Sequence, residues 1–414
     1  MALSPVRRWC ALLSLALGGF AIGATEFVAM GLLPNIAQDL LPELYAADRD
    51  AGTGRAGWLI SAYALGVVVG APLFAVLCVR VSRTRLLLAL LGVFIAGTLA
   101  SALLPSFGLV LAARFAAALP HGAYFGTASL VAATLMGPGR QGQGIAVVLS
   151  GLTISNVVGV PAITWLGQLA GWRIAYLAVA GIFVLTLVAV LLAVPAQPGN
   201  RNATARQELR IFRLPQAWLT MGAAAIGFGG FFAVYSYITD VVTEVTRMPL
   251  SFVPWALAAI GLGMTVGNLL GGWLADRNLP LTLLVGMPVF TITLVALALA
   301  ARSPAGLLVT AFAMGTASAT LIPSLQTRFI RISGDAQLIA AALNHSAFNI
   351  GNSLGAFLGG AAIAAGFGYL APTVIGVALS CLGLVVIVIS FVLERAQRPP
   401  VVPAVEPDRV AALT

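Results

Sequence analysis

The sequence predicts an all-α integral membrane protein with twelve transmembrane helices in two pseudo-symmetric six-helix bundles. Three observations predict this fold class. Hydrophobic residues make up 60% of the 414 residues and charged residues only 8%, whereas soluble domains carry about 25% charged residues. Apolar runs of about 20 residues, the length that a helix needs to cross a bilayer, recur along the chain. The third observation is an internal repeat that relates the two halves.

The repeat is clearest in two apolar segments, Trp58–Arg80 and Trp255–Arg277, which lie 197 positions apart. Five identities keep that offset: Trp58/Trp255, Ala62/Ala259, Gly66/Gly263, Gly70/Gly267 and Arg80/Arg277. Small residues at every fourth position of a helix let a neighbouring backbone approach closely in lipid. Two further segments pair in the same way, Asn156–Gly159 with Asn352–Gly355 and Ala21–Gly23 with Ala225–Gly227. The repeat is typical of secondary transporters, whose substrate site lies between the repeats near the bilayer midplane.

In chain order, the expected spans cover roughly residues 10–34, 56–78, 84–104, 108–136, 144–168, 173–194, 217–239, 251–275, 281–301, 306–327, 339–366 and 371–393. The first run is too long for a signal-peptide core and lacks a clear cleavage site, so we expect a retained helix. The expected organisation is an N-terminal bundle at 1–194, a cytoplasmic linker at 195–216 and a C-terminal bundle at 217–394. A Pro- and Val-rich tail at 395–414 is expected to be disordered and cytoplasmic.

Arginine supplies all 22 basic residues, because the sequence contains no lysine. If the N-terminus is inside, 16 arginines fall in cytoplasmic segments, five outside and one, Arg114, within a span. This asymmetry predicts a multi-pass protein of a bacterial inner membrane with both termini cytoplasmic. The net charge of +9 then indicates topology and contact with anionic membrane lipid. Because the arginines are dispersed over loops, nucleic-acid binding is not expected. We expect a monomer.

Several motifs stand at defined places along the chain. The loop after the second span reads AVLCVRVSR over 75–83, and its counterpart reads GWLADR over 272–277. The fifth span carries Gly151, Gly159, Pro161 and Gly167. The segments GATEF (23–27), PHGA (120–123) and NHSAFN (344–349) lie in the first, fourth and eleventh spans. From about residue 8 to 394, the chain resembles the major facilitator superfamily, and within it the sugar-efflux or arabinose-efflux-like permeases and the chloramphenicol exporters of the drug:proton antiporter group.

The resemblance implies gating roles for Arg80, Arg83, Asp276 and Arg277 in the cytoplasmic loops. The first copy departs from the family pattern, because Val79 stands where the pattern has an acid. Val79 puts in doubt the charge-relay contact that the family has on the cytoplasmic face of the N-terminal half. Asp276 can still provide that contact in the C-terminal half. The Gly151, Gly159, Pro161 and Gly167 set looks like the motif of exporters that exchange substrate for protons. Glycine and proline can thin and bend a helix where the halves rock, although a Gly-rich packing helix is the alternative.

Four ionisable residues, Glu26, Arg114, His121 and His345, lie well inside expected spans. Such residues are costly in lipid and usually face a cavity or a partner. At a rise of 1.5 Å per residue, Glu26 and Arg114 lie about 12 Å and about 9 Å from the outer ends of their spans. We expect them to interact and to couple transport to protons, with Glu26 as the carrier. A static ion pair that fixes helix packing is the alternative.

Substrate contacts are expected from seven residues: Phe27, His121, Tyr124, Phe231, Phe232, Tyr235 and Asn349. Aromatic rings with polar tips suit amphipathic drugs or sugar faces. A packed histidine is an equally good interpretation of His121, and an interfacial aromatic belt accounts almost as well for Tyr235. For His345, hydrogen bonding between helices is favoured over ligand contact.

The favoured function is proton-coupled export of a small organic solute, a sugar or an amphipathic drug such as chloramphenicol. A proton-independent facilitator or importer is the alternative. An integral-membrane enzyme is disfavoured, because the chain lacks clustered catalytic carboxylates and an HExxH motif. ATP-driven pumping would need a Gly-Lys-Ser/Thr loop, which a chain without lysine cannot form. No metal or cofactor is expected.

Overall fold

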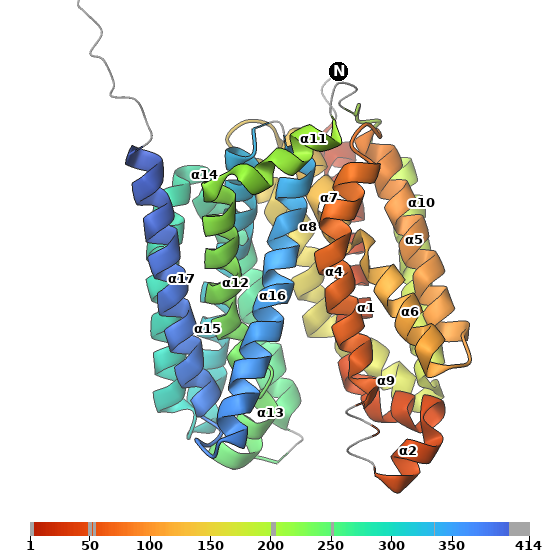
Figure 1. Ribbon diagram of the computed structural model, residues 1–414, viewed down its shortest axis with the longest axis vertical. Helices are drawn as coiled ribbons and strands as arrows, with labels where there is room; N and C mark the ends of the chain where they lie inside the picture. Colours follow the sequence, from red (N-terminus) through yellow and green to blue (C-terminus); the bar gives the residue numbers. More distant parts are fainter. Residues whose placement is uncertain are drawn as a thin grey trace, which may run out of the picture.

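The computed structural model describes residues 4–48, 52, 55–199, 204–249, 252–334 and 336–396, which form helices, turns and loops without a strand. The helices run side by side in two bundles (Figure 1), which confirms the predicted all-α class. The start of α1 and α11 lie at one end of the bundles, and α2 and α13 lie at the other. We call these ends the linker face and the α2 face.

The N-terminal bundle is built from the first six spans. It contains α1 (Pro5–Leu40), α2 (Pro42–Ala47), α4 (Trp58–Leu77), α5 (Arg83–Leu103), α6 (Phe107–Ala118), α7 (Pro120–Met136), α8 (Gln141–Ile154), a π-helical turn (Ser155–Gly159), α9 (Val160–Ala170) and α10 (Trp172–Ala193). The short α2 lies beyond the end of the first span. Segments α6 and α7 together form the fourth span, and α8 to α9 form the fifth.

A linker and six further spans complete the chain. The linker contains α11 (Ala205–Glu208) and a 3₁₀ turn (Leu209–Arg213). The C-terminal bundle contains α12 (Pro215–Tyr235), α13 (Ile238–Asp240), a π-helical turn (Val241–Val245), α14 (Val253–Ala300), α15 (Pro304–Ile332), α16 (Gln337–Ala364) and α17 (Ala371–Ala396). The predicted tail lies almost wholly outside the described residues.

Twelve crossings follow from these elements. In the described part of the chain, eight helices are individually long and apolar enough to span a membrane. One of them, α14, contains two spans, because Asn278 has non-helical backbone angles (φ −154°, ψ 87°) and breaks its path. The remaining three spans are the shorter α4, the α6–α7 pair interrupted at Leu119, and α16 with its polar run. The predicted twelve-helix fold is therefore confirmed.

The glycines of the repeat bring equivalent helices into contact in both bundles. A methyl group at Gly70 would strike the backbone of Leu119, and one at Gly267 would strike Thr316, which lies 197 positions after Leu119. The second span therefore packs on the fourth span in one bundle, and the eighth span packs on the tenth in the other. Close backbone approach at small residues is the form of helix packing that a membrane favours.

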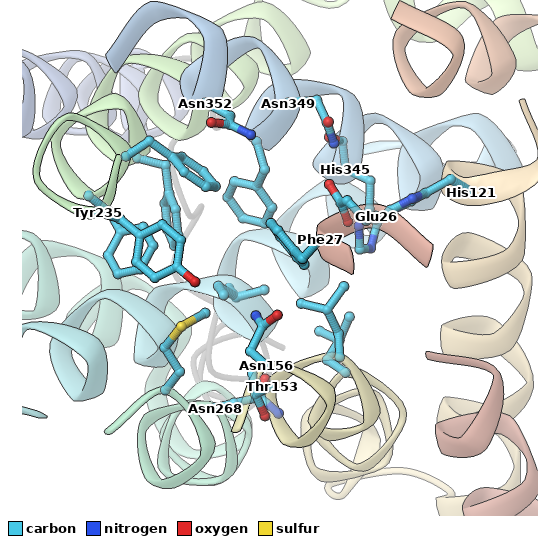
Figure 2. Close-up of a pocket in the computed structure, with 18 residues that line it drawn as sticks. Glu26, Phe27, His121, Thr153, Asn156, Tyr235, Asn268, His345, Asn349 and Asn352 are labelled. Carbon is cyan, nitrogen blue, oxygen red and sulfur yellow. The ribbon is translucent and has the colours of Figure 1, made fainter. Parts of the chain in front are cut away.

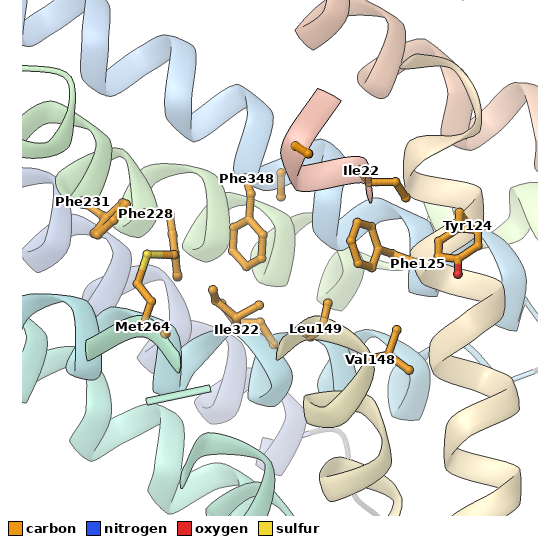
Figure 3. Packing of buried hydrophobic residues seen from close by; sticks show 14 of the residues in the cluster. Ile22, Tyr124, Phe125, Val148, Leu149, Phe228, Phe231, Met264, Ile322 and Phe348 are labelled. Carbon is orange, nitrogen blue, oxygen red and sulfur yellow. The ribbon is translucent and has the colours of Figure 1, made fainter. Parts of the chain in front are cut away.

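Contacts between the two bundles run from the linker face toward the middle of the molecule. Helix α8 meets the first limb of α14, where Asn268 Nδ2 donates to the Ala146 carbonyl at 2.7 Å. On the other side, α16 packs against α4 and α7, and a methyl group at Gly122 would contact the Ala342 carbonyl. Buried aromatic and aliphatic side chains from both bundles meet at this level (Figure 3).

Candidate transport pocket

A pocket lies between the two bundles and is lined by 18 residues (Figure 2). The N-terminal bundle contributes Glu26, Phe27, His121, Leu149, Leu152, Thr153 and Asn156. The C-terminal bundle contributes Phe228, Phe231, Phe232, Tyr235, Met264, Asn268, Ile322, His345, Phe348, Asn349 and Asn352. Six of the seven predicted substrate residues line the pocket, and so does Glu26.

The Glu26 carboxylate is only partly buried and faces the pocket. Within the described part of the chain, it accepts no hydrogen bond and forms no ion pair. Figure 2 shows it beside His121 and His345, with Tyr235 on the opposite side of the pocket. In the described residues the carboxyl group of Glu26 is therefore not held by a fixed partner.

Arg114 is fully buried and lies outside the set of lining residues. Its Nη1 donates to Thr25 Oγ1 at 3.1 Å, and its guanidinium lies 4.4 Å from the ring centre of Tyr63 and 5.4 Å from that of Tyr176. The carboxylate of Glu26 is within range of its electrostatic field but not within ion-pair distance. Arg114 therefore bonds to the residue that precedes Glu26, and the two ionisable side chains form no ion pair with each other in this structure.

Glycine packing sets the position of α1 and hence of Glu26. A methyl group at Gly151 would strike the Ala16 backbone, one at Gly159 the Phe20 ring, and one at Gly167 the Leu32 side chain. The exporter-type glycines therefore face α1 inside their own bundle rather than the opposite bundle. The π-helical turn just before Pro161 is the irregular part of this span. Because proline has no N–H, it interrupts regular helical hydrogen bonding there.

Two histidines connect the bundles across the pocket. The rings of His121 and His345 lie 5.3 Å apart, and His345 stacks on Phe125 at 4.2 Å. Nδ1 of His121 lies 3.2 Å from the Tyr63 hydroxyl. Nε2 of His345 is buried without a hydrogen-bond partner in the described residues. The hydrogen bond between helices that we expected of His345 is therefore not made by Nε2, and the ring lines the pocket.

Aromatic side chains form the wall on the side of the C-terminal bundle. Phe231 stacks on Tyr235 with ring centres 5.4 Å apart and 18° between the planes. Phe228 lies 4.3 Å from Phe348 of α16, and Phe232 meets Phe231 edge to face. Offset and edge-to-face pairs of this kind hold rings in fixed orientations. The wall therefore offers a pre-formed apolar surface.

Amide side chains add polar groups to the pocket. Asn349 Nδ2 donates to the His345 carbonyl at 3.0 Å. The Oδ1 atoms of Asn156 and Asn268 are buried and have no partner in the described residues. Buried acceptors without partners are costly unless water or a ligand satisfies them.

Tyr124 is the predicted substrate residue that does not line the pocket. Its side chain is fully buried, its hydroxyl donates to the Leu15 carbonyl at 3.0 Å, and it packs beside Phe125 (Figure 3). Helix α7 turns this residue toward α1, whereas His121, three positions earlier, faces the pocket. In this structure Tyr124 therefore packs behind the pocket, and its predicted contact with substrate stays a prediction.

Several lining residues were not predicted from the sequence, among them Phe228, Asn268 and Phe348, and Asn156 and Asn352 were not assigned to the site. A signal existed for the last two, because the repeat pairs them 196 positions apart in apolar spans. A polar side chain within such a span usually faces a cavity or another polar group.

The predicted gating residues lie toward the linker face. Asp276 accepts hydrogen bonds from the backbone amides of Gly142, at 2.7 Å, and Gln143, at 3.0 Å, at the start of α8. Arg277 lies 3.7 Å from the ring centre of Trp273. Arg80 is exposed in the loop before α5, and Arg83 is the first residue of α5. Of these residues, Asp276 makes a direct contact between the bundles.

The model of the Major Facilitator Superfamily matches the chain over residues 15–277 and 241–413. The inner membrane transport protein YdhP of Escherichia coli K12 is 37% identical over 92% of this chain and 95% of its own length. A chloramphenicol resistance protein of Streptomyces lividans is 33% identical over 86% of this chain and 90% of its own.

Among solved structures, the human organic anion transporter MFSD10 superposes with a TM-score of 0.72 at 14% identity, covering 93% of this chain and all of its own. This likeness supports the fold, and the sequence relatives are transporters rather than enzymes. The family match, the twelve-span architecture and the pocket between two repeated bundles agree, and the chain belongs to the major facilitator superfamily of membrane transporters.

Proposed function

We propose that this transporter exports a small, neutral, amphipathic solute, such as chloramphenicol, in exchange for protons. The observation that carries the proposal is the Glu26 carboxylate, which lines the pocket without a hydrogen bond or ion pair in the described residues. Acidic side chains at such positions serve as proton relays in pumps and transporters. Because no fixed partner must be released, Glu26 can gain and lose a proton within the transport cycle.

The lining of the pocket supports the choice of solute. Six of its 18 residues are phenylalanine or tyrosine, four are asparagine, and the described lining contains one carboxylate and no arginine. An anionic solute would meet Glu26 without a compensating cation. A neutral molecule with an aromatic ring and hydroxyl or amide groups can use both the ring faces and the asparagines. The similarity to a chloramphenicol resistance protein supports the same class.

The arginine distribution supports a cytoplasmic location for the linker face, and the similarity to YdhP supports a bacterial inner membrane. With the bundles in contact toward the linker face, Glu26 would exchange protons with the outside. After the bundles switch, a solute arriving from the cytoplasm would displace that proton. One solute molecule then leaves as protons enter, driven by the proton gradient. We further propose that the transporter acts as a monomer surrounded by anionic lipid.

Proteoliposomes with an imposed pH gradient and a trapped pH indicator test this proposal. Chloramphenicol, arabinose, a thiogalactoside and a purine nucleoside are added in turn to wild type, Glu26→Gln and Glu244→Gln. Glu244 is the matched control, because it is an exposed carboxylate outside the pocket. We expect chloramphenicol to trigger proton flux in wild type and Glu244→Gln, and not in Glu26→Gln.

Two results would contradict the proposal. Labelled chloramphenicol that equilibrates without moving protons would identify a facilitator. Proton flux that persists in Glu26→Gln would remove Glu26 from the proton path. A response only to arabinose or the thiogalactoside would keep the coupling and replace the proposed solute class with sugars.

A further inference from the structure

Two long helices begin at equivalent positions near the linker face. Helix α8 begins at Gln141 and α16 begins at Gln337, 196 positions later, the offset that relates the fifth and eleventh spans. The first backbone amides of any helix lack partners within the helix and carry partial positive charge. Each of these helix starts can therefore bind an acceptor from elsewhere in the protein.

At α8 the acceptor comes from the opposite bundle. The two oxygens of Asp276 accept from the amides of Gly142 and Gln143. The repeat places Val79 at the position equivalent to Asp276, because each directly precedes the arginine that both copies share, Arg80 or Arg277. Valine has no acceptor atom in its side chain, so position 79 cannot provide the equivalent bond to α16.

At α16 a carboxylate from the linker supplies that bond. Glu208 Oε2 accepts from the backbone amide of Ile339 at 3.0 Å. Ile339 is the repeat equivalent of Gln143, 196 positions later. Glu208 is only 4% exposed, which is unusual for a glutamate in a linker. The same helix position is therefore bonded by an acid in both bundles, although the acids come from different segments.

The surrounding contacts hold Glu208 between the bundles. A capping box formed by Thr204 and Gln207 starts α11, and Ile211 is buried in an apolar cluster with α15 and α16. Figure 1 shows α11 crossing the linker face between the bundles. Helix α11 also packs against α4 of the N-terminal bundle, and Glu208 lies within electrostatic range of Arg83, the first residue of α5. The carboxylate thus interacts with both bundles.

We propose that Glu208 is a gating residue that takes the place of the acid missing at Val79. By binding the start of α16 while interacting with Arg83, it holds the bundles together at the linker face. Asp276 does the same at the start of α8. Opening of the linker face requires both contacts to break, so the linker takes part in the transport cycle rather than only joining the bundles.

Hydrogen exchange of the full chain in nanodiscs tests this role without requiring a substrate. In Glu208→Ala we expect roughly tenfold faster exchange at the first turn of α16, since a charge-assisted bond is lost. A gating role also requires faster exchange at the first turn of α8 and faster alkylation of Cys78, which is partly buried beside Val79. Alkylation is measured with Cys10 and Cys381, both exposed, replaced by serine.

Controls separate gating from simple helix capping. Arg206→Ala changes an exposed residue of the same short helix and should leave every readout at the wild-type level. Val79→Asp added to Glu208→Ala should slow exchange and alkylation again. If Glu208→Ala does not fold, Glu208→Gln provides the test, because it keeps an acceptor for Ile339 but loses the charge toward Arg83.

Faster exchange confined to α16 would show a local cap and overturn the gating role, as would wild-type behaviour of both Glu208 variants. Failure of Val79→Asp to restore closure would show that position 79 is not the one that Glu208 replaces. None of these readouts depends on protons or on Glu26, so they stand apart from the proposal of proton-coupled export.

Discussion

The two bundles share their packing but differ in chemistry where they meet. The repeat pairs Phe27 with Phe231, and both line the pocket, yet it pairs Glu26 with Gly230. A side chain at Gly230 would strike the Gly376 carbonyl of α17. At the offset of 197, Arg114 and His121 pair with Ala311 and Ser318, which are uncharged and buried.

From this difference we infer that the two bundles have separate roles in transport. The N-terminal bundle carries the carboxylate of the pocket and the buried arginine behind it. The C-terminal bundle carries five of the six phenylalanine and tyrosine residues in the lining. Close glycine packing is kept in both, because both must hold their helices together in lipid. Charge within a membrane is costly, and the proton coupling that we propose needs a carboxylate in only one of the two bundles.

The largest expected effect comes from removing the buried charge of the N-terminal bundle. Arg114→Ala would leave a cavity beneath Tyr63 and Tyr176 and remove the bond to Thr25. Large-to-small changes of this kind cost about 2–5 kcal/mol. We expect a marked fall in thermal unfolding temperature in detergent, with Arg302→Ala, an exposed arginine, as the control. An unchanged melting curve would show that Arg114 does not hold this bundle together.

An intermediate effect is expected on the aromatic side. Tyr235→Ala removes a ring that stacks on Phe231 and lines the pocket. Loss of one aromatic contact, about 1.4 kcal/mol, corresponds to roughly tenfold weaker chloramphenicol binding. The number of protons exchanged per solute should not change, because Glu26 remains. Trp218→Ala, on the same helix but exposed, is the control for binding. A changed proton count would mean that the two tasks are not separated between the bundles.

The smallest effect is expected behind the pocket. Tyr124→Phe removes the hydroxyl that donates to the Leu15 carbonyl and leaves the ring in place. The cost should be about 1 kcal/mol of stability, with chloramphenicol affinity unchanged. Thermal unfolding and equilibrium binding on the same samples check both parts. Weaker chloramphenicol binding without lower stability would show that Tyr124 contacts the solute.

The sequence predicted the fold because composition, span length and the repeat each constrain it directly. Helix rise predicts similar levels for Glu26 and Arg114, and Arg114 does bond to Thr25, the residue before Glu26. Helix rise does not say which way a side chain faces. The side chains of Arg114 and Tyr124 both bond to α1 and do not line the pocket. Their orientation depends on how the neighbouring helices pack.

Local irregularities account for other misses. The π-helical turn Ser155–Gly159 contains Asn156, and a wider turn changes which side chains face the pocket. Glu208 could not be assigned from sequence, because the linker reaches α16 only in the folded chain. The missing acid at Val79 was visible in the sequence, but its replacement was not.

Proton release on binding tests the proposed role of Glu26 as the proton carrier most directly. It is measured in weakly buffered detergent with a pH indicator as chloramphenicol is added. If solute displaces the proton of Glu26, wild type releases on the order of one proton per bound molecule, and its apparent affinity weakens as pH falls. Glu26→Gln should bind chloramphenicol and release none, with an affinity that does not depend on pH. Equal proton release from wild type and Glu26→Gln would contradict the proposal that Glu26 carries the exchanged proton.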